Sequence, residues 1–258
     1  MTIPVLTGST TTGPAGPGLI LGPSLGTSSI LWDRASPILA ARFNLLAFDL
    51  PGHGNSPAAG EPFSMADLAD GVVRLADDAG FDTFCYAGVS LGGQVGIELA
   101  LRHPDRVLGL AIICSAAKIG EQSGWDERAA TVRAQGTPVM VGGSATRWFA
   151  PGFIAAQPEA ASALLHALSD TDDESYALCC EALGRSDTRA RLGEILAPTI
   201  AIYGVEDTVI SDADAAFIAH AVPDGAALGI DGAAHLAPIE QPEILATALI
   251  DFFGRDGR

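Results

Sequence analysis

The sequence predicts an α/β fold in which a mostly parallel, doubly wound sheet carries an inserted helical cap. Short apolar runs alternate with helix-like segments at both ends of the chain, and such alternation is typical of parallel sheets. Between residues 120 and 191 the strand pattern stops, and amphipathic helix-like segments take its place. We therefore predict two core segments, residues 1–119 and 192–258, separated by a cap over residues 120–191.

Length and composition agree with one large domain. The chain has 258 residues, of which 48% are hydrophobic, enough for a core domain with an insertion. Its formal net charge is −17 at pH 7, and nucleic acids and anionic membranes bind basic surfaces, so neither is an expected partner. An anionic small molecule would need a positive group inside its own site.

The sequence predicts neither a membrane-spanning helix nor a signal peptide. It contains no apolar run of about eighteen residues, the length of a membrane-spanning helix. The first residues lack the basic and then apolar layout of a signal peptide. The four cysteines follow neither metal-ligand spacing nor the pattern of a disulfide framework. We expect a cytoplasmic protein without a metal ion.

The predicted elements follow one another along the chain. Residues 1–18 are rich in Thr, Gly and Pro and predict one short strand and then a flexible loop. The expected strands are apolar and short: Ile3–Leu6, Gly18–Gly22, Phe43–Phe48, Phe84–Val89, Val107–Cys114, Pro198–Gly204 and Ala226–Ile230. The expected helices are Trp32–Ala41, a segment capped by Ser64, Gln94–Arg102, Glu127–Gln135, Ala160–Ser169, Ser175–Gly184, Asp212–Ala221 and Pro242–Phe253.

A glycine-flanked serine stands at the centre of this pattern. Gly88-x-Ser90-x-Gly92 follows the strand that ends at Val89 and precedes a helix. Strand, sharp turn and helix form the context of a nucleophile elbow, in which the serine Oγ stands clear of the sheet. We predict that Ser90 is a catalytic nucleophile.

A serine nucleophile needs a base, and the base needs an acid that fixes its tautomer. His235 follows the last predicted strand and lies at the carboxyl edge of the sheet, where sites collect. Asp207 follows the preceding strand, with Glu206 as its rival. The remaining downstream histidines fit structural roles or solvated helix faces: His103, His166 and His220. We predict a triad of Ser90, Asp207 and His235.

Acyl transfer also needs hydrogen-bond donors for the developing oxyanion. The backbone N–H of Leu91 follows the nucleophile directly. Leu25 is the best-placed second donor, because it lies in the turn after the Gly18–Gly22 strand. His53, between two glycines, is expected to shape a turn beside the site.

These residues together resemble the α/β-hydrolase superfamily over nearly the whole chain. The resemblance lies in Gly88–Gly93, in Asp49-x-x-Gly52-His53-Gly54-x-Ser56, and in Asp207 and His235 in that order. Many members have His-Gly in the oxyanion turn, where this chain has Pro23-Ser24. The resemblance implies an α/β-hydrolase fold and a serine hydrolase without a cofactor.

More specific segments resemble the 3-oxoadipate enol-lactone hydrolases, which open an enol-lactone in aromatic degradation. These segments are Ser24–Thr27 with Trp32, Ala116–Gly120, Arg147–Pro151, Tyr176-x-x-Cys179-Cys180-x-Ala182, and His235-Leu236 followed by Glu240-Gln241-Pro242. Pro23 replaces the asparagine that is usual in that branch. The resemblance implies a small anionic lactone or ester as substrate.

Such a substrate carries a free carboxylate. Arg147 and Trp148, at the predicted boundary of cap and core, are the leading candidates to contact it, and Lys118 and Ser24 are further ones. Arg147 could instead be a surface arginine paired with cap carboxylates, and Trp148 could be plain cap core.

Other functions stay open at this stage. A general esterase or lactonase, a carbon–carbon hydrolase or a perhydrolase would use the same triad. A binding protein on the same fold would be expected to have lost a triad residue, and none is lost here. The oligomeric state, monomer or homodimer, is left open.

Overall fold

The computed structural model describes residues 2–13 and 16–254, and within them the chain forms a seven-stranded sheet in the order β1-β3-β2-β4-β5-β6-β7. Only β1 is antiparallel, to β3, and the other neighbours are parallel. The strands are β1 Thr7–Thr11, β2 Gly18–Gly22, β3 Asn44–Asp49, β4 Phe84–Val89, β5 Val107–Ile113, β6 Thr199–Gly204 and β7 Gly225–Ile230.

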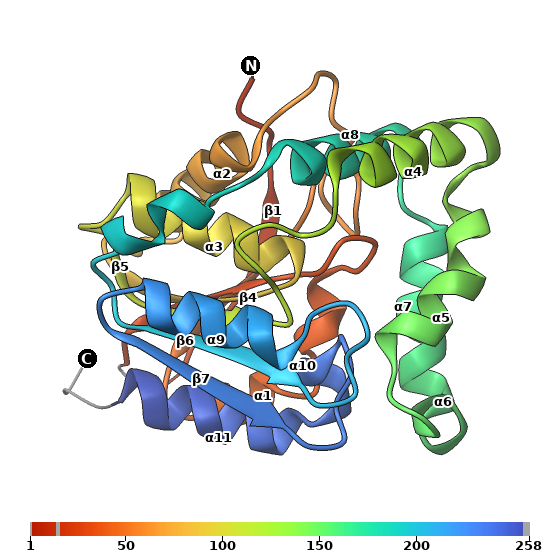
Figure 1. Cartoon of the computed structure of the whole chain (residues 1–258). Coiled ribbons are helices and arrows are strands. Elements are labelled where there is room, and N and C mark those ends of the chain that lie inside the picture. The colour runs from red at the N-terminus through yellow and green to blue at the C-terminus, as the bar shows by residue number, and fades with distance from the viewer. Residues whose placement is uncertain (1, 14–15, 255–258) are drawn as a thin grey trace.

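Helices cover both faces of the sheet, as predicted for a doubly wound fold. In Figure 1, α2, α3 and α9 lie on one face, and α1 and α11 lie on the other. All residues of β2 and β4 are buried, because these central strands are covered on both sides. The core helices are α1 Ser36–Leu39, α2 Met65–Asp78, α3 Leu91–Arg102, α9 Asp212–Ala221, α10 Ala237–Glu240 and α11 Pro242–Phe253.

The predicted first strand, Ile3–Leu6, is wrong. The first strand is Thr7–Thr11, and it pairs with β3 in a register that places Thr7 opposite Asp49. Pro4 lacks the N–H that a strand ladder needs, whereas threonines favour strands and suit a polar sheet edge. Residues 1 and 14–15 of the predicted N-terminal strand and loop lie outside the described residues.

The predicted helix Trp32–Ala41 is also wrong. The segment instead forms a 3-10 helix over Ser29–Trp32 and a single turn, α1, over Ser36–Leu39. Pro37 explains the break, because proline is tolerated in the first turn of a helix and disrupts its interior.

A helical insertion runs from β5 to β6, and Figure 1 shows it over the top and right of the sheet domain. It contains α4 Gln122–Gln135, α5 Val141–Trp148, α6 Phe153–Ala156, α7 Pro158–Ser169 and α8 Asp173–Arg185, with 3-10 helices at Thr137–Met140 and Arg189–Glu194. The sequence did not predict α5 or α6. The division at residues 120 and 191 stays a prediction, and residues 255–258 of the predicted second core segment lie outside the described part.

The ends of the parallel strands determine where a site can form. The carboxyl ends of β2, β4, β6 and β7 lead into the segments that carry Leu25, Ser90, Asp207 and His235. Because parallel strands end at one edge of the sheet, these four residues are brought together. Among the described helices, none has the length and apolar character that crossing a membrane requires.

Candidate active site

The turn between β4 and α3 forces Ser90 into an unusual backbone conformation. Its φ is 54° and its ψ is −114°, a region that residues other than glycine rarely occupy. A Cβ at Gly88 would lie 2.2 Å from the carbonyl oxygen of Gly92, and one at Gly92 would lie 2.6 Å from the carbonyl oxygen of Pro23. The flanking glycines therefore allow strand, turn and helix to pack closely around the serine.

Neighbouring strands hold this turn in place. The N–H of Ser90 donates to the carbonyl of Ile113 at 2.9 Å, at the end of β5. The hydroxyl of Ser115 donates to the carbonyl of Ser90 at 2.7 Å. The strained backbone of Ser90 is thus fixed on both sides of its Cα.

His235 and Asp207 form a buried pair. Nδ1 of His235 lies 2.8 Å from Oδ2 of Asp207, and their side chains are only 5% and 0% exposed. The other oxygen, Oδ1, accepts the backbone N–H groups of Val209 and Ile210 at 2.7 and 3.3 Å. The carboxylate fixes the proton on Nδ1, so that Nε2 keeps a lone pair with which to accept a proton.

Ser90 and His235 line one cavity of about 240 Å³. Of the other residues predicted for the site, Ser24, Leu25, Arg147 and Trp148 also line it. The remaining lining residues are Ile119, Gly120, Trp125, Arg128 and Val209. The cavity therefore has the predicted nucleophile and base on the sheet side and the helical insertion on the other.

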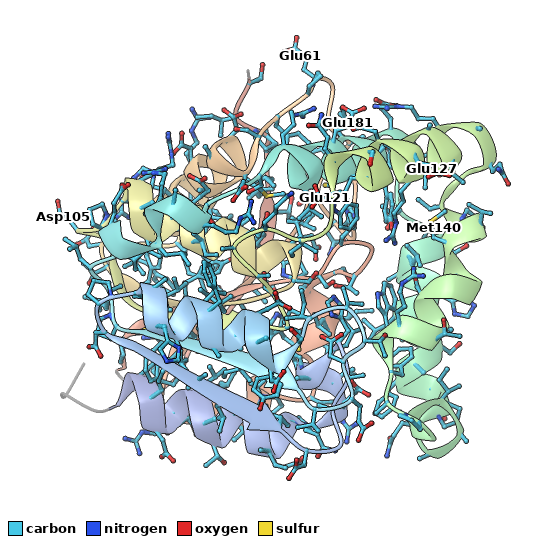
Figure 2. All side chains as sticks on the ribbon, viewed as in Figure 1. Glu61, Asp105, Glu121, Glu127, Met140 and Glu181 are labelled. Carbon is cyan, nitrogen blue, oxygen red and sulfur yellow. The ribbon has the colours of Figure 1, made fainter. Side chains whose placement is uncertain are left out.

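Lys118 is not brought to this cavity. Its Nζ forms an ion pair with Glu121 at 2.6 Å, and Glu121 lies where the chain enters α4 (Figure 2). Glu206, the rival acid, is exposed on the turn before Asp207.

Two buried backbone N–H groups have no acceptor among the described residues. Leu91 is the first residue of α3, and the first N–H groups of a helix have no intrahelical partner. Leu25 lies in the turn after β2, and it is 5% exposed. Because buried N–H groups are nearly always paired, these two donors are suited to an oxyanion.

His53 lies beneath the turn that carries Leu25. The ring of His53 is buried, its Nδ1 is 2.8 Å from the carbonyl of Pro51, and its Nε2 accepts the N–H of Gly26 at 3.1 Å. Burial lowers the pKa of His53 to about 4, against smaller opposing effects of Pro51 and nearby carboxylates. The ring therefore stays neutral at ordinary pH.

The insertion places two arginines on the wall of the cavity. Within residues 2–13 and 16–254, no Asp or Glu forms an ion pair with Arg128 or Arg147, although the chain has 31 acidic residues. The Nε of Arg128 is buried without a hydrogen-bond partner. Burial, and then the charge of Arg128, lower the pKa of Arg147. Two cations that face one cavity without counterions favour an anionic ligand there.

Aromatic rings orient Arg128. Its guanidinium lies 5.5 Å from the ring centroids of both Trp125 and Tyr176, and Nη2 donates to the Tyr176 hydroxyl. Sequence reasoning missed Arg128 and Trp125. Their spacing of three residues places them on one face of α4, but the same spacing occurs on any solvated helix.

The sequence did not predict the role of a buried carboxyl group, that of Glu240. Oε1 of Glu240 accepts the N–H of Ala150 at 2.6 Å, and Oε2 accepts the N–H of Ala234 at 2.8 Å. The N–H of Leu236 is a further donor to this group. Burial raises the pKa of Glu240, and the three N–H groups oppose that shift. Glu240 thus joins the insertion to both neighbours of His235.

The other predicted structural and surface histidines lie apart from the cavity. His103 pairs with Asp70 at 2.8 Å at the end of α3. His166 and His220 are exposed on α7 and α9. In the described part of the chain, no three side chains of His, Cys, Asp or Glu come together as a metal site.

Comparison with known proteins agrees with the fold. A family model of the alpha/beta hydrolase fold matches residues 17–135. The chain is 35% identical over 227 residues to 3-oxoadipate enol-lactonase 2 of Acinetobacter baylyi and 31% identical over 227 residues to 3-oxoadipate enol-lactonase 1 of the same organism. Each match covers 88% of this chain and 85% of the relative. The crystal structure of the enol-lactonase from Burkholderia xenovorans LB400 superimposes with a TM-score of 0.91 at 29% identity, covering 96% of this chain and 95% of that one.

Proposed function

Since this chain belongs to the α/β-hydrolase family, we propose that it is a cofactor-free serine hydrolase that opens 3-oxoadipate enol-lactone to 3-oxoadipate. Support comes from relatives more than 30% identical that are enol-lactonases, and from the residues around the cavity. The observation that carries the substrate assignment is that Arg128 and Arg147 line the same cavity as Ser90 and, among the described residues, form no ion pair with a carboxylate.

Acylation begins at the lactone carbonyl. Oγ of Ser90 attacks the carbonyl carbon while Nε2 of His235 takes the hydroxyl proton. The carbonyl oxygen becomes an oxyanion that accepts the N–H groups of Leu25 and Leu91. The ring ester bond then breaks, and His235 returns the proton to the leaving enol oxygen, which tautomerises to a ketone.

Water completes the reaction. Nε2 of His235 removes a proton from a water molecule as the oxygen attacks the acyl carbon. The same two N–H groups hold the second oxyanion. Collapse releases Ser90 and a carboxylic acid, so that the net reaction adds one water to the lactone. Asp207 keeps the imidazole oriented and stabilises its charged form in both steps.

The substrate carboxylate, separate from the lactone, binds at the other end of the cavity in this proposal. Arg147 supplies one guanidinium, as the sequence predicted, and Arg128 supplies another. Trp125 and Trp148 line the same region and exclude water, which strengthens the charge interaction. On a chain of net charge −17, these arginines make the site locally attractive to an anion.

The direct test follows the loss of ultraviolet absorbance of the enol-lactone. Wild type, Ser90→Ala and Arg147→Ala are compared, with an uncharged nitrophenyl ester as a second substrate. We expect fast lactone turnover that Ser90→Ala abolishes and a raised KM in Arg147→Ala. Fast hydrolysis of the nitrophenyl ester without lactone turnover would support a serine hydrolase but reject 3-oxoadipate enol-lactone as its substrate.

A fluorophosphonate probe separates an enzyme from a binding protein on the same fold. The probe modifies an activated serine, so we expect labelling of wild type that is lost in Ser90→Ala. If wild type is not labelled and hydrolyses neither ester, the proposed function is wrong.

A further inference from the structure

We infer that His53 is a positioning residue of the oxyanion hole, because it fixes the turn that carries Leu25 through the N–H of Gly26. This inference rests on the proposed function, in which Leu25 donates to the oxyanion. It assigns a role in catalysis to a side chain that never touches the substrate, since His53 does not line the cavity.

The two ring nitrogens of His53 have distinct partners. Nδ1 faces the carbonyl of Pro51, which can only accept, so Nδ1 carries the proton. Nε2 faces the N–H of Gly26, which can only donate, so Nε2 carries the lone pair. The geometry thus selects one neutral tautomer. Protonation of Nε2 would place two donors against each other and release Gly26.

Few other groups hold this turn. Within it, the carbonyl of Ser24 accepts the N–H and the hydroxyl of Thr27. Toward α3, the carbonyl of Pro23 accepts the N–H of Gly92 at 3.1 Å. The bond from Gly26 to His53 fixes the other end of the turn. Leu25 therefore lies between one attachment to the elbow helix and one to the ring of His53.

The insertion packs against the same turn. A Cβ at Gly26 would lie 2.6 Å from Cδ1 of Leu168 and 3.3 Å from the ring of Tyr176. That ring also stacks on His53, with 6.2 Å between centroids and an interplanar angle of 21°. Because Gly26 has a φ of 79° and no room for a side chain, the turn cannot easily be stabilised by a larger residue there. The hydrogen bond from the N–H of Gly26 to Nε2 of His53 stabilises the turn instead.

Transition-state and ground-state binding distinguish this role from a purely structural one. A trifluoromethyl ketone forms a tetrahedral adduct: Oγ of Ser90 bonds to the carbonyl carbon, its proton moves to His235, and the carbonyl oxygen becomes the oxyanion. A short keto acid such as levulinate presents its carboxylate to the cavity without forming an adduct. Only the first ligand depends strongly on the oxyanion donors.

We test His53→Leu, which removes the acceptor, and His53→Gln, whose Oε1 can still accept from Gly26. We expect His53→Leu to lower kcat and the affinity for the trifluoromethyl ketone by about 10- to 100-fold each, because small displacements of an oxyanion donor cost that much. KM and levulinate affinity should change by less than about twofold, and His53→Gln should recover part of kcat. Equal loss of both affinities, or full kcat in a folded His53→Leu, would overturn the inference.

Two further measurements keep the inference testable if the leucine variant does not fold or the lactone is not the substrate. Nitrogen-15 NMR of wild type reads the tautomer directly, and we expect an unprotonated Nε2 from pH 8 down to pH 5. A proton on Nε2 in that range would reject the inference. If wild type hydrolyses a nitrophenyl ester but not the lactone, the kinetic comparison of the variants is made on that ester. If wild type hydrolyses neither ester, both the proposed function and the role of His53 fail.

Discussion

The two sides of the cavity are built in different ways. On the sheet side, short segments after parallel strands place Ser90, Asp207 and His235, and the carboxylate of Asp207 accepts three hydrogen bonds. On the insertion side, the cavity wall carries Arg128 and Arg147 without carboxylate partners. On the sheet side Asp207 has His235 as its partner, whereas the insertion side has positive charge that no described carboxylate neutralises.

A neighbour on the same helix sharpens this contrast. Arg133 lies five residues after Arg128 on α4, and it pairs with Glu174 at 2.7 Å and with Glu181 on α8 (Figure 2). Hydrogen bonds to these two carboxylates raise the pKa of Arg133. The insertion therefore has carboxylates available, and it places them on its outer surface. In the proposed function, the sheet side supplies the chemistry and the insertion side selects the substrate.

The largest expected effect comes from the sheet side. Asp207→Asn should lower kcat by about 10⁴-fold, because an amide in that place stabilises the wrong tautomer of His235 and cannot support its charge. Glu206→Gln is the matched control, since it removes the neighbouring exposed carboxylate, and we expect activity within about twofold of wild type. Kinetics on a nitrophenyl ester measure both. A larger loss of kcat in Glu206→Gln than in Asp207→Asn would show that Glu206, and not Asp207, is the acid of the triad.

Substitutions on the insertion side should affect the hydrolysis of anionic substrates only. Arg128→Met and Arg147→Met should each lower kcat/KM for the anionic lactone by about 10- to 100-fold, the equivalent of one charge-assisted hydrogen bond. Hydrolysis of an uncharged nitrophenyl ester should change little. Arg74→Met, at an exposed position on α2, controls for loss of one positive charge from the chain. Equal losses on charged and uncharged esters would show that the arginines support the fold and do not select the substrate.

Glu240 connects the two sides of the cavity, and its replacement should lower both the stability of the chain and its kcat. In Glu240→Gln an amide NH₂ takes the place of one oxygen and faces the N–H of Ala150 or Ala234. We expect a loss of about 2–4 kcal/mol in the free energy of unfolding, because buried N–H groups are left unpaired, and a lower kcat because the loop of His235 loosens. Denaturant unfolding measures the first and ester kinetics the second. Glu243→Gln, on the exposed face of α11, should do neither.

The sequence was most informative where chemistry depends on local order along the chain. The place of Ser90 on the cavity could be predicted because glycines flank it between a strand and a helix, and that of His235 because it follows the last strand. Arg128 could not, because a helix face turned toward a cavity has the same spacing as one turned toward solvent. Glu240 lies in a short helix after His235, and only the folded chain shows that Ala150, ninety residues earlier, donates to it.

Lys118 is a residue that the sequence placed at the site and the structure does not bring there. Its charge and its place before the insertion favoured substrate contact, but Glu121, three residues later, pairs with it. The Ile3–Leu6 prediction failed for a similar reason. An apolar run near the end of a chain does not reveal which neighbouring segment pairs with the sheet edge, and the polar threonines that follow it do so.

The smallest expected effect is a difference in stability with pH. Burial outweighs the carboxylates of Asp49 and Asp172, and lowers the pKa of His53 from 6.5 to about 4. The unfolded chain therefore binds more protons than the folded one between these values, so the stability that the neutral ring retains at pH 7 falls as pH drops. Between pH 7 and pH 5, proton uptake by His53 in the unfolded chain should lower the free energy of unfolding of wild type by about 2 kcal/mol. His53→Gln should show no such loss from this position. Denaturant titrations at several pH values measure the difference in slope. Parallel curves for wild type and His53→Gln would mean that folding leaves the proton uptake of His53 unchanged, so that the ring would be charged at pH 5 and Gly26 would need another acceptor there.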